Sequence, residues 1–325
     1  MAELAYRQAV AAGLAQEMDR DPTVVLIGED IGAAGGVFKA TVGLYERFGG
    51  ARVWDTPISE QAIIGAAMGG AMTGVRPVAE IMFSDFLATC WDGVANEIAK
   101  MRYMTGGQVC LPLVIRCANG GGVHFGAQHS QSVEHWAMAV PGLKVVAPST
   151  PADVKGLLAA AIRDDDPVVF FEHKELYASV GEVPEGEHVV PLGQAHRVRE
   201  GSDVTLVSLA AGVGVATEAA EILAQEHGLE AEVLDLRTLV PLDVPAVLES
   251  VGRTGRLVIV EETPRPLGWG AEVTSVVVEE GFDLLDAPIV RVTTAPVPLP
   301  ATPALEALAR PSVDRVVKAV TSLLS

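Results

Sequence analysis

Residues 55–70 read Asp-Thr-Pro-Ile-Ser-Glu-Gln-Ala-Ile-Ile-Gly-Ala-Ala-Met-Gly-Gly. Ser59 is a typical helix N-cap residue, so the stretch predicts a helix that begins beside it, with Glu60 in the first turn. The helix dipole favours a carboxylate at that position, which is by itself a sufficient reason for Glu60. Glycine is costly in an exposed helix, so Gly65 and Gly69 predict close packing or an interface.

Apolar strands and helices alternate on both sides of this helix. Strands are expected at 23–27, 53–55, 77–83, 111–116, 143–147 and 168–171, and further helices at 3–18, 85–103 and 151–163. Strand–helix–strand order repeated in this way indicates a parallel, doubly wound sheet.

A second α/β region follows residues 181–202, which are polar, rich in turn residues and aperiodic, as is typical of a surface linker. Strands are then expected at 203–209, 231–235, 256–261 and 289–293, and helices at 213–227, 243–252, 268–280 and 312–323. The predicted organisation is a domain at 1–180, a linker at 181–202 and a smaller domain at 203–325, both with mainly parallel sheets.

The composition excludes several classes of protein. A formal net charge of −19 argues against binding of nucleic acid or anionic lipid, and either solubility or a basic protein partner explains it. The N-terminus has no apolar signal core, and the longest uncharged stretches are too short to span a bilayer, so we expect a soluble, cytoplasmic protein. Cys90, Cys110 and Cys117 form no CxxC motif and stand among apolar residues, which predicts reduced core cysteines.

The second region contains a near match to a dinucleotide-binding fingerprint. Gly212-Val-Gly214 follows a predicted strand and opens a predicted helix, and Asp235 ends the next strand. Thr217 replaces the third glycine, and a strand-to-helix turn uses glycine for steric reasons alone. A structural turn is therefore favoured, and an NAD-binding dehydrogenase is kept as an alternative.

Several motifs together resemble the β subunit of heterotetrameric, thiamine-diphosphate-dependent 2-oxo acid dehydrogenases, the E1 components. Glu60 followed by Gly65 and Gly69 is similar to the pyrimidine-binding motif of thiamine-diphosphate enzymes. The other matching motifs cover essentially the whole chain: Gly28-Glu-Asp30, Gly35-Gly-Val-Phe38, Lys100-Met-Arg-Tyr103, Gln128-His-Ser-Gln-Ser132, Pro141-Gly-Leu-Lys-Val-Val146, Ala161-Ile-Arg-Asp164, Asp235-Leu-Arg-Thr238 and Pro241-Leu-Asp243. The implied fold is a thiamine-diphosphate pyrimidine-binding domain and a transketolase C-terminal-like domain.

The resemblance implies roles for four side chains. Glu60 would bind the aminopyrimidine ring nitrogen N1′, which favours the imino tautomer needed to activate the cofactor, and a dry pocket would raise the glutamate pKa. Phe86 would stack on the aminopyrimidine, although a core role also explains it. Glu29 would be a buried acid near the cofactor or a structural hydrogen-bonding group. His129 would line the active-site channel and move protons during acyl transfer to lipoamide.

The resemblance also implies a structural potassium site. Its ligands would be main-chain carbonyls at Leu113, Ala161, Ile162 and Asp164, together with residue 166. That residue is Asp166 here, whereas relatives often carry asparagine.

No Gly-Asp-Gly segment occurs in the chain. In the family this segment and a later asparagine hold the diphosphate and its Mg²⁺, so the resemblance implies that an α subunit supplies them in an α₂β₂ enzyme. The implied reaction is decarboxylation of a 2-oxo acid, pyruvate first, with acyl transfer to an E2 lipoyl domain. An acetoin- or branched-chain-specific E1 and a non-catalytic stabilising subunit are the alternatives. Acidic residues Glu279, Glu280 and Asp283 are expected to meet the basic subunit-binding domain of E2.

Overall fold

The computed structural model describes residues 1–324, which form two compact units. Unit 1 comprises residues 1–119 and 136–192. Unit 2 comprises residues 120–135 and the chain from Gly193 onward. No helix within residues 1–324 is long and apolar enough to cross a membrane.

Unit 1 is built on a parallel sheet in which the strands are ordered β6-β7-β5-β4-β2-β3. β2, β5 and β7 are buried along their whole length, as expected for strands of a parallel sheet covered on both faces. The strands of this sheet are β2 (Val24–Gly28), β3 (Val53–Asp55), β4 (Arg76–Ile81), β5 (Val114–Asn119), β6 (Lys144–Val146) and β7 (Val168–His173).

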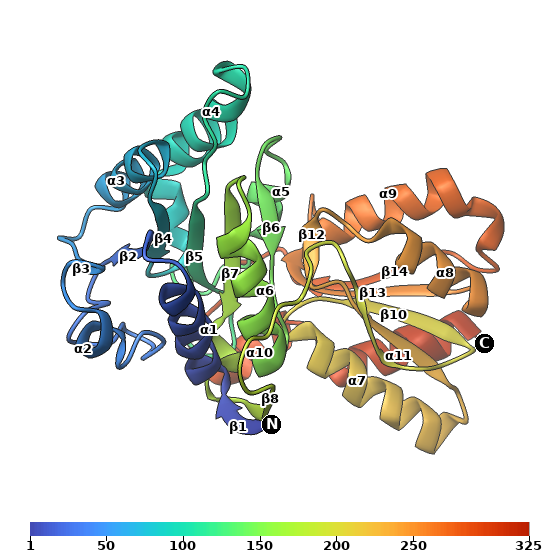
Figure 1. Ribbon diagram of the computed structural model, residues 1–325. Helices are drawn as coiled ribbons and strands as arrows, with labels where there is room; N and C mark the ends of the chain where they lie inside the picture. Colours follow the sequence, from blue (N-terminus) through green and yellow to red (C-terminus); the bar gives the residue numbers. More distant parts are fainter. Residues whose placement is uncertain (325) are drawn as a thin grey trace. The chain divides into compact units, whose positions relative to one another are not determined.

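Helices α1 (Tyr6–Arg20) and α6 (Pro151–Arg163) pack side by side on this sheet (Figure 1). Their apolar sides form the core of unit 1 with the strands. The α3 helix (Glu60–Met72) packs against β4, and α4 (Ala99–Met104) lies beside it in Figure 1. The remaining elements are β1 (Ala2–Ala5) paired antiparallel with β8 (Val180–Val183), α2 (Leu44–Phe48), α5 (Glu134–Met138), the 3₁₀ helices η1 (Ser84–Thr89) and η3 (Lys174–Ala178), and the π-helix η2 (Gly93–Ile98).

Unit 2 contains a five-stranded sheet in the order β14-β13-β10-β11-β9, parallel except for β9. Figure 1 shows α7 and α11 on one face and α8 and α9 on the other. The elements are β9 (His196–Arg199), β10 (Val204–Ser208), α7 (Gly212–Ile222), η4 (Leu223–His227), β11 (Ala231–Asp235), β12 (Thr238–Val240), α8 (Val244–Thr254), β13 (Leu257–Pro264), α9 (Trp269–Gly281), η5 (Phe282–Leu284), β14 (Val290–Thr294), α10 (Pro303–Ala309) and α11 (Val313–Leu324).

The limits of the two units differ from the predicted domain limits at two places. The segment 120–135 belongs to unit 2, although the flanking chain is in unit 1. The predicted linker, 181–202, contains most of β8 and all of β9, which pair antiparallel with β1 and β11.

Two further expectations differ from the structure. The helix expected at 85–103 is broken into η1, η2 and α4, and Gly93 within it approaches Ile64 of α3 so closely that a Cβ there would lie 3.1 Å from Ile64 Cγ2. Cys90 and Cys117 are buried as predicted, but Cys110 is exposed, because it lies in the irregular segment that follows α4.

Candidate active site

Glu60 is the first residue of α3, and its side chain is half-buried. Ser59 occupies the N-cap position as predicted, but its hydroxyl accepts no hydrogen bond from the helix. The Ser59 carbonyl accepts the first intrahelical bond, from Ile63 N at 3.0 Å. Glu60 itself makes no hydrogen bond or ion pair with any residue in the described range 1–324. Its carboxylate therefore has the favourable field of a helix N-terminus and no fixed partner among these residues.

Glu29 follows β2 directly and senses the charge of Glu60. β2 and β3 are paired in parallel with Gly28 opposite Asp55, so the chain leaves both strands at the same edge of the sheet. Burial raises the pKa of Glu29, and the negative charges of Asp30 and Glu60 raise it further. Two carboxylates that repel each other disfavour double ionisation, so this edge holds a proton more readily than an isolated glutamate would.

Phe86 lies in η1, and its ring is partly buried. Cys90 interacts both with Phe86 and with the charge of Glu60. Its thiol is 3.7 Å from Phe86 O, and the negative charge of Glu60 contributes to its pKa. Burial, with a smaller contribution from Glu60, raises the pKa of this thiol to about 12, so Cys90 stays protonated and unreactive. The charge of Glu60 therefore acts on both Glu29 and Cys90, and Cys90 contacts the backbone of Phe86.

A buried ion cluster was not predicted from the sequence. Arg116 on β5, only 2% exposed, donates to both oxygens of Glu172 on β7, at 2.6 and 2.8 Å, and to Glu80 on β4 at 2.7 Å. Tyr177 completes it by donating to Glu172 at 2.9 Å. The available signal was a charged residue inside each of three otherwise mainly apolar strands that are neighbours in the sheet: Glu80, Arg116 and Glu172.

This cluster also supports the aromatic residues that lead to Phe86. The Tyr177 ring stacks on Phe38 with centroids 4.9 Å apart, and the Phe38 ring meets Phe83 edge-on at 5.5 Å. Phe83 in turn meets Phe86 edge-on at 5.6 Å. Phe86 is therefore held by a row of rings within unit 1, which limits the positions that its own ring can take.

His129 lies in unit 2, in the segment 120–135. The side chain is partly buried, and the backbone N–H of His129 donates to Gly126 O at 3.3 Å in a tight turn. Glutamates of unit 2 bind the backbone earlier in the same segment. These contacts pack the start of the segment, Gly120-Gly121-Gly122, closely within unit 2.

The residues predicted to hold potassium lie close together in unit 1. Leu111 N donates to Asp165 O, and Val168 N donates to Leu113 O, so the segment 111–113 runs beside the segment 165–168. The carbonyls of Ile162 and Asp164 each accept one bond from Arg76 Nη1, at 3.0 and 3.1 Å. A carbonyl oxygen has two lone pairs, so each keeps one for a further ligand.

Carboxylates near these carbonyls are already paired with cations. Lys144 Nζ donates to both oxygens of Asp164, and Arg102 forms a short ion pair with Asp166. The extra negative charge of Asp166, relative to an asparagine, is therefore balanced within the chain.

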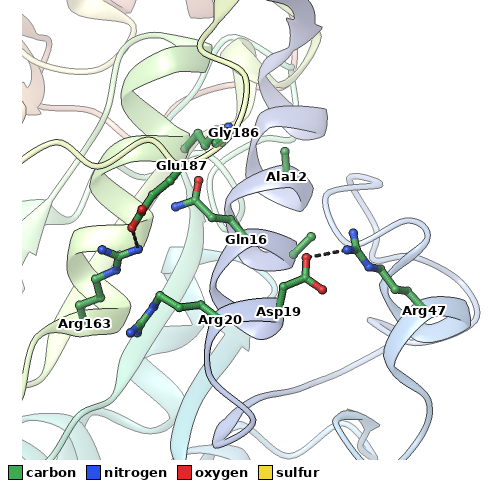
Figure 2. A pocket seen from close by; sticks show the side chains of 10 residues that line it. Ala12, Gln16, Asp19, Arg20, Arg47, Arg163, Gly186 and Glu187 are labelled. Carbon is green, nitrogen blue, oxygen red and sulfur yellow. Dashed lines mark hydrogen bonds and ion pairs between the residues drawn. The ribbon is translucent and has the colours of Figure 1, made fainter.

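Figure 2 shows a surface cavity of about 550 Å³ that none of the predicted site residues lines. Its cations come from α1, α2 and α6, and carboxylates or carbonyls bind them. Arg163 donates to Glu17 and to Glu187, and Arg47 donates to Asp19 at 2.5 Å. The cavity is therefore lined by charge pairs that join these helices.

Gly212 has a packing role at the start of α7. A Cβ at this residue would lie 2.5 Å from Ser208 Oγ and 3.3 Å from Val260 O. Asp235 is fully buried, and its carboxylate accepts a hydrogen bond from Arg237 N at 2.9 Å. Steric need thus accounts for Gly212 and a backbone contact for Asp235, whereas a Cβ at Gly214 would meet no described atom within 4 Å.

Comparison with protein families matches residues 2–179 to the transketolase pyrimidine-binding domain and residues 193–316 to the transketolase C-terminal domain. The chain is 47% identical to an acetoin:2,6-dichlorophenolindophenol oxidoreductase subunit beta of Cupriavidus necator, covering 98% of this chain and 96% of the relative. It is 45% identical to a pyruvate dehydrogenase E1 component subunit beta of Rickettsia felis, with 98% and 97% covered. It is also 44% identical to a 2-oxoisovalerate dehydrogenase subunit beta of Bacillus subtilis, with 99% of each covered.

A solved structure of a split-gene transketolase, an inactive β4 tetramer, superposes with a TM-score of 0.80 at 26% identity, covering 99% of this chain and 98% of that one. The fold and the two matched domains define a transketolase-like protein with a pyrimidine-binding and a C-terminal domain. Within that class, the chain belongs to the family of E1 β subunits of 2-oxo acid dehydrogenases.

Proposed function

We propose that the chain is the β subunit of an E1 enzyme that decarboxylates a 2-oxo acid with thiamine diphosphate and transfers the acyl group to lipoamide. The observation that carries the proposal is the carboxylate of Glu60, which binds no partner among residues 1–324 and whose charge acts on Glu29 and on Cys90, a contact of the Phe86 backbone. A carboxyl in this setting fits the ring nitrogen of an aminopyrimidine, and the row of aromatic rings fits its flat face.

Each side chain has a distinct task in this proposal. Glu60 shares a proton with ring nitrogen N1′, and the repulsion between Glu29 and Glu60 helps to keep one proton at this edge. Phe86 orients the ring by stacking on it. When bound, thiamine diphosphate would supply a nucleophilic carbon. His129 acts later, as the group that moves protons during acyl transfer.

An α subunit is the expected partner beside Glu60. Gly65 and Gly69 on α3 are exposed, and a Cβ at either would meet no atom within 4 Å, so the small-residue face is unpacked within this chain. Ile58, Tyr103 and Met104, near the ends of α3 and α4, are large apolar residues that are 76%, 89% and 67% exposed. We assign this surface to the α subunit, which would also supply the Gly-Asp-Gly segment for the diphosphate and Mg²⁺.

The end of α9 is the proposed contact for E2. Glu279, Glu280 and Asp283 are exposed there, and Phe282 between them is 68% exposed. An acidic surface with one apolar side chain suits a basic subunit-binding domain. Charge reversal at the three acidic positions should weaken binding of E2 at low salt, and unchanged affinity would exclude this surface.

A potassium ion is proposed at the carbonyls of Leu113, Ala161, Ile162 and Asp164 and at Asp166. Its role would be to tie the segment before β5 to the end of α6, so it would act on stability rather than on chemistry. The melting temperature should then be higher in KCl than in NaCl of equal concentration. Equal melting temperatures in the two salts would remove the site from the proposal.

Pyruvate is the proposed substrate, with acetoin and 2-oxoisovalerate as the alternatives that the names of the relatives raise. The test is co-expression of the chain with an α subunit, followed by assay of the purified complex with each of the three substrates. Turnover that requires added thiamine diphosphate supports the proposal. A Glu60→Gln complex that keeps full activity would show that this chain only stabilises its partner.

A further inference from the structure

The segment 120–131 of unit 2 is a closed loop whose ends are joined. Gly120 N donates to Gln131 O at 3.0 Å, and His129 lies shortly before the second end. The loop has no regular secondary structure. Its shape therefore depends on contacts made by its backbone and side chains with the rest of unit 2.

Two glutamates distant in sequence bind consecutive parts of this loop. Gly121 N donates to Glu262 Oε1 at 2.5 Å. Glu306 accepts from Gly122 N at 2.8 Å and from His124 N at 3.2 Å. The His124 ring nitrogen Nδ1 lies 2.5 Å from the same carboxylate. We call Glu262 and Glu306 the carboxylate clamp.

The clamp is held firmly in place. The Glu306 side chain is 1% exposed and comes from α10, whereas Glu262 is 11% exposed and comes from β13. Arg310, just after α10, donates to the second oxygen of Glu262 at 3.3 Å. Hydrogen bonds from backbone N–H groups to a buried carboxylate are among the stronger ones, because the acceptor is charged and little exposed to water.

The loop backbone requires such a clamp. Gly120, Gly122 and Gly126 have φ values of +83°, +87° and +78°, which glycine adopts without cost. His124 has φ +62°, a left-handed conformation that is unfavourable for a residue with a Cβ. A strained residue persists only where its surroundings fix it, and here Glu306 binds both its backbone and its ring.

We propose that Glu306 is a positioning residue for His129, and that it acts by holding the loop in one conformation. The inference rests on the proposed role of His129 in acyl transfer. Glu306 binds the start of the loop, and the turn from Gly126 to His129 continues from it. Glu262 supports the same segment from the neighbouring strand. Neither glutamate touches substrate in this account.

The test uses the assembled enzyme with Glu306→Gln, which keeps the size of the side chain but turns an N–H donor toward the loop. Acyl transfer to a lipoyl domain should fall about 10- to 100-fold, since small displacements of a reacting group have effects of this size. Decarboxylation measured with an artificial electron acceptor should change much less. Glu272→Gln, the same change at an exposed position in α9, should alter neither rate.

A double-mutant cycle separates positioning from a general structural effect. If Glu306 acts through His129, then Glu306→Gln should cost nothing further in a His129→Ala enzyme. Full additivity of the two losses would overturn the proposal. Glu262→Gln should reproduce the effect of Glu306→Gln in a weaker form, which keeps the test available if the first variant folds poorly.

Hydrogen exchange on the β chain alone distinguishes this inference from the proposed function. Glu306→Gln should speed exchange in the peptide that covers 120–131 and leave the peptide that covers α3 unchanged. Unchanged exchange at 120–131 would overturn the clamp whatever the activity. Faster exchange together with a fully active His129→Ala enzyme would instead keep the clamp as a structural device and reject the role of His129.

Discussion

Glu60 and Glu306 are the same residue type in the first part of a helix, yet their environments are opposite. Glu306 is buried and binds two backbone N–H groups and a histidine ring of its own chain. Glu60 is half-buried and binds none, and its nearest charged neighbours include another carboxylate. The field of a helix N-terminus favours both, so the dipole does not explain the difference.

The two glutamates therefore differ in whether their hydrogen bonds are made within the described chain, as for Glu306, or remain available to a ligand, as for Glu60. A carboxylate whose acceptors are all used by its own chain stabilises a conformation. A carboxylate placed beside a second one, with no hydrogen-bond donor among residues 1–324, gains only the field of the helix N-terminus from its own fold and can accept a donor from a ligand. Variants of the bonded carboxylate should therefore change stability, and variants of the unbonded one should change activity.

Glu60→Gln should show the largest effect, and only on activity. Removing the ionisable group should lower thiamine-dependent decarboxylation by the assembled enzyme on the order of 10²- to 10⁴-fold, as for other proton-transfer groups. The free energy of unfolding of the isolated chain should change by less than about 0.5 kcal/mol, because no hydrogen bond is lost. Urea titration of the chain beside assays of the complex measures both. A large loss of stability would show that Glu60 has a structural partner after all.

Arg116→Met, in the same unit as Glu60, should instead have a large effect on stability. The change leaves Glu80 and Glu172 buried without their cation, which typically costs about 3–5 kcal/mol. The free energy of unfolding of the isolated chain, measured by urea titration, should fall by this amount. The matched control is Arg102→Met, which breaks an exposed ion pair with Asp166 and should cost less than about 1 kcal/mol. Equal losses in the two variants would contradict the distinction between buried and exposed pairs.

The fold of both units could be predicted from the sequence because local patterns specify it. Apolar runs identified β2 and the start of β7, and Ser59 correctly located the start of α3. Local patterns did not predict the structure where tertiary contacts determine the backbone conformation. The helix expected at 85–103 is interrupted near Gly93, where it packs closely on α3, and no property of the sequence around Gly93 reports that neighbour.

The candidate site divides in the same way. Glu60, Phe86 and His129 were found through family motifs, and their tasks remain proposals. The carboxylate clamp escaped detection because Glu262 is 141 residues from Gly121, and Glu306 is 184 residues from Gly122. Contacts over such separations follow from the packed fold and leave no periodic signal in the sequence.

Gly121→Ala should disturb the packing of the loop 120–131 against the carboxylate clamp without changing a charge. A Cβ there would lie 2.9 Å from both Glu306 Oε1 and Leu299 Cδ1, so the clamp must move. Overpacking of this kind should lower the free energy of unfolding by about 1–3 kcal/mol. Gly214→Ala is the control, because a Cβ there meets nothing within 4 Å in α7, and alanine should be neutral or slightly stabilising. If the two alanines had equal effects in urea titrations, the loop would not be tightly packed.

The smallest expected effect is a change in the pKa of Glu29, whose neighbour is Glu60. Burial and the charges of Asp30 and Glu60 raise this pKa above its ordinary value of 4.5. The folded state therefore binds the proton more tightly than the unfolded state, and this contribution to stability is complete below the ordinary pKa and is lost as pH rises through the raised one. Glu60→Gln removes one of the two charges, so the pKa of Glu29 should move down toward its ordinary value and the pH dependence should weaken.

A carboxyl ¹³C NMR titration of the isolated chain, with and without Glu60→Gln, measures this shift directly. Glu272→Gln, which removes a distant exposed carboxylate, should leave the titration of Glu29 unchanged. Because burial is the main cause of the raised pKa, the value should stay above the ordinary one even in the Glu60→Gln chain. If Glu29 titrated identically in all three chains, the two carboxylates would not share a site, and the contrast between Glu60 and Glu306 would reduce to a difference in exposure.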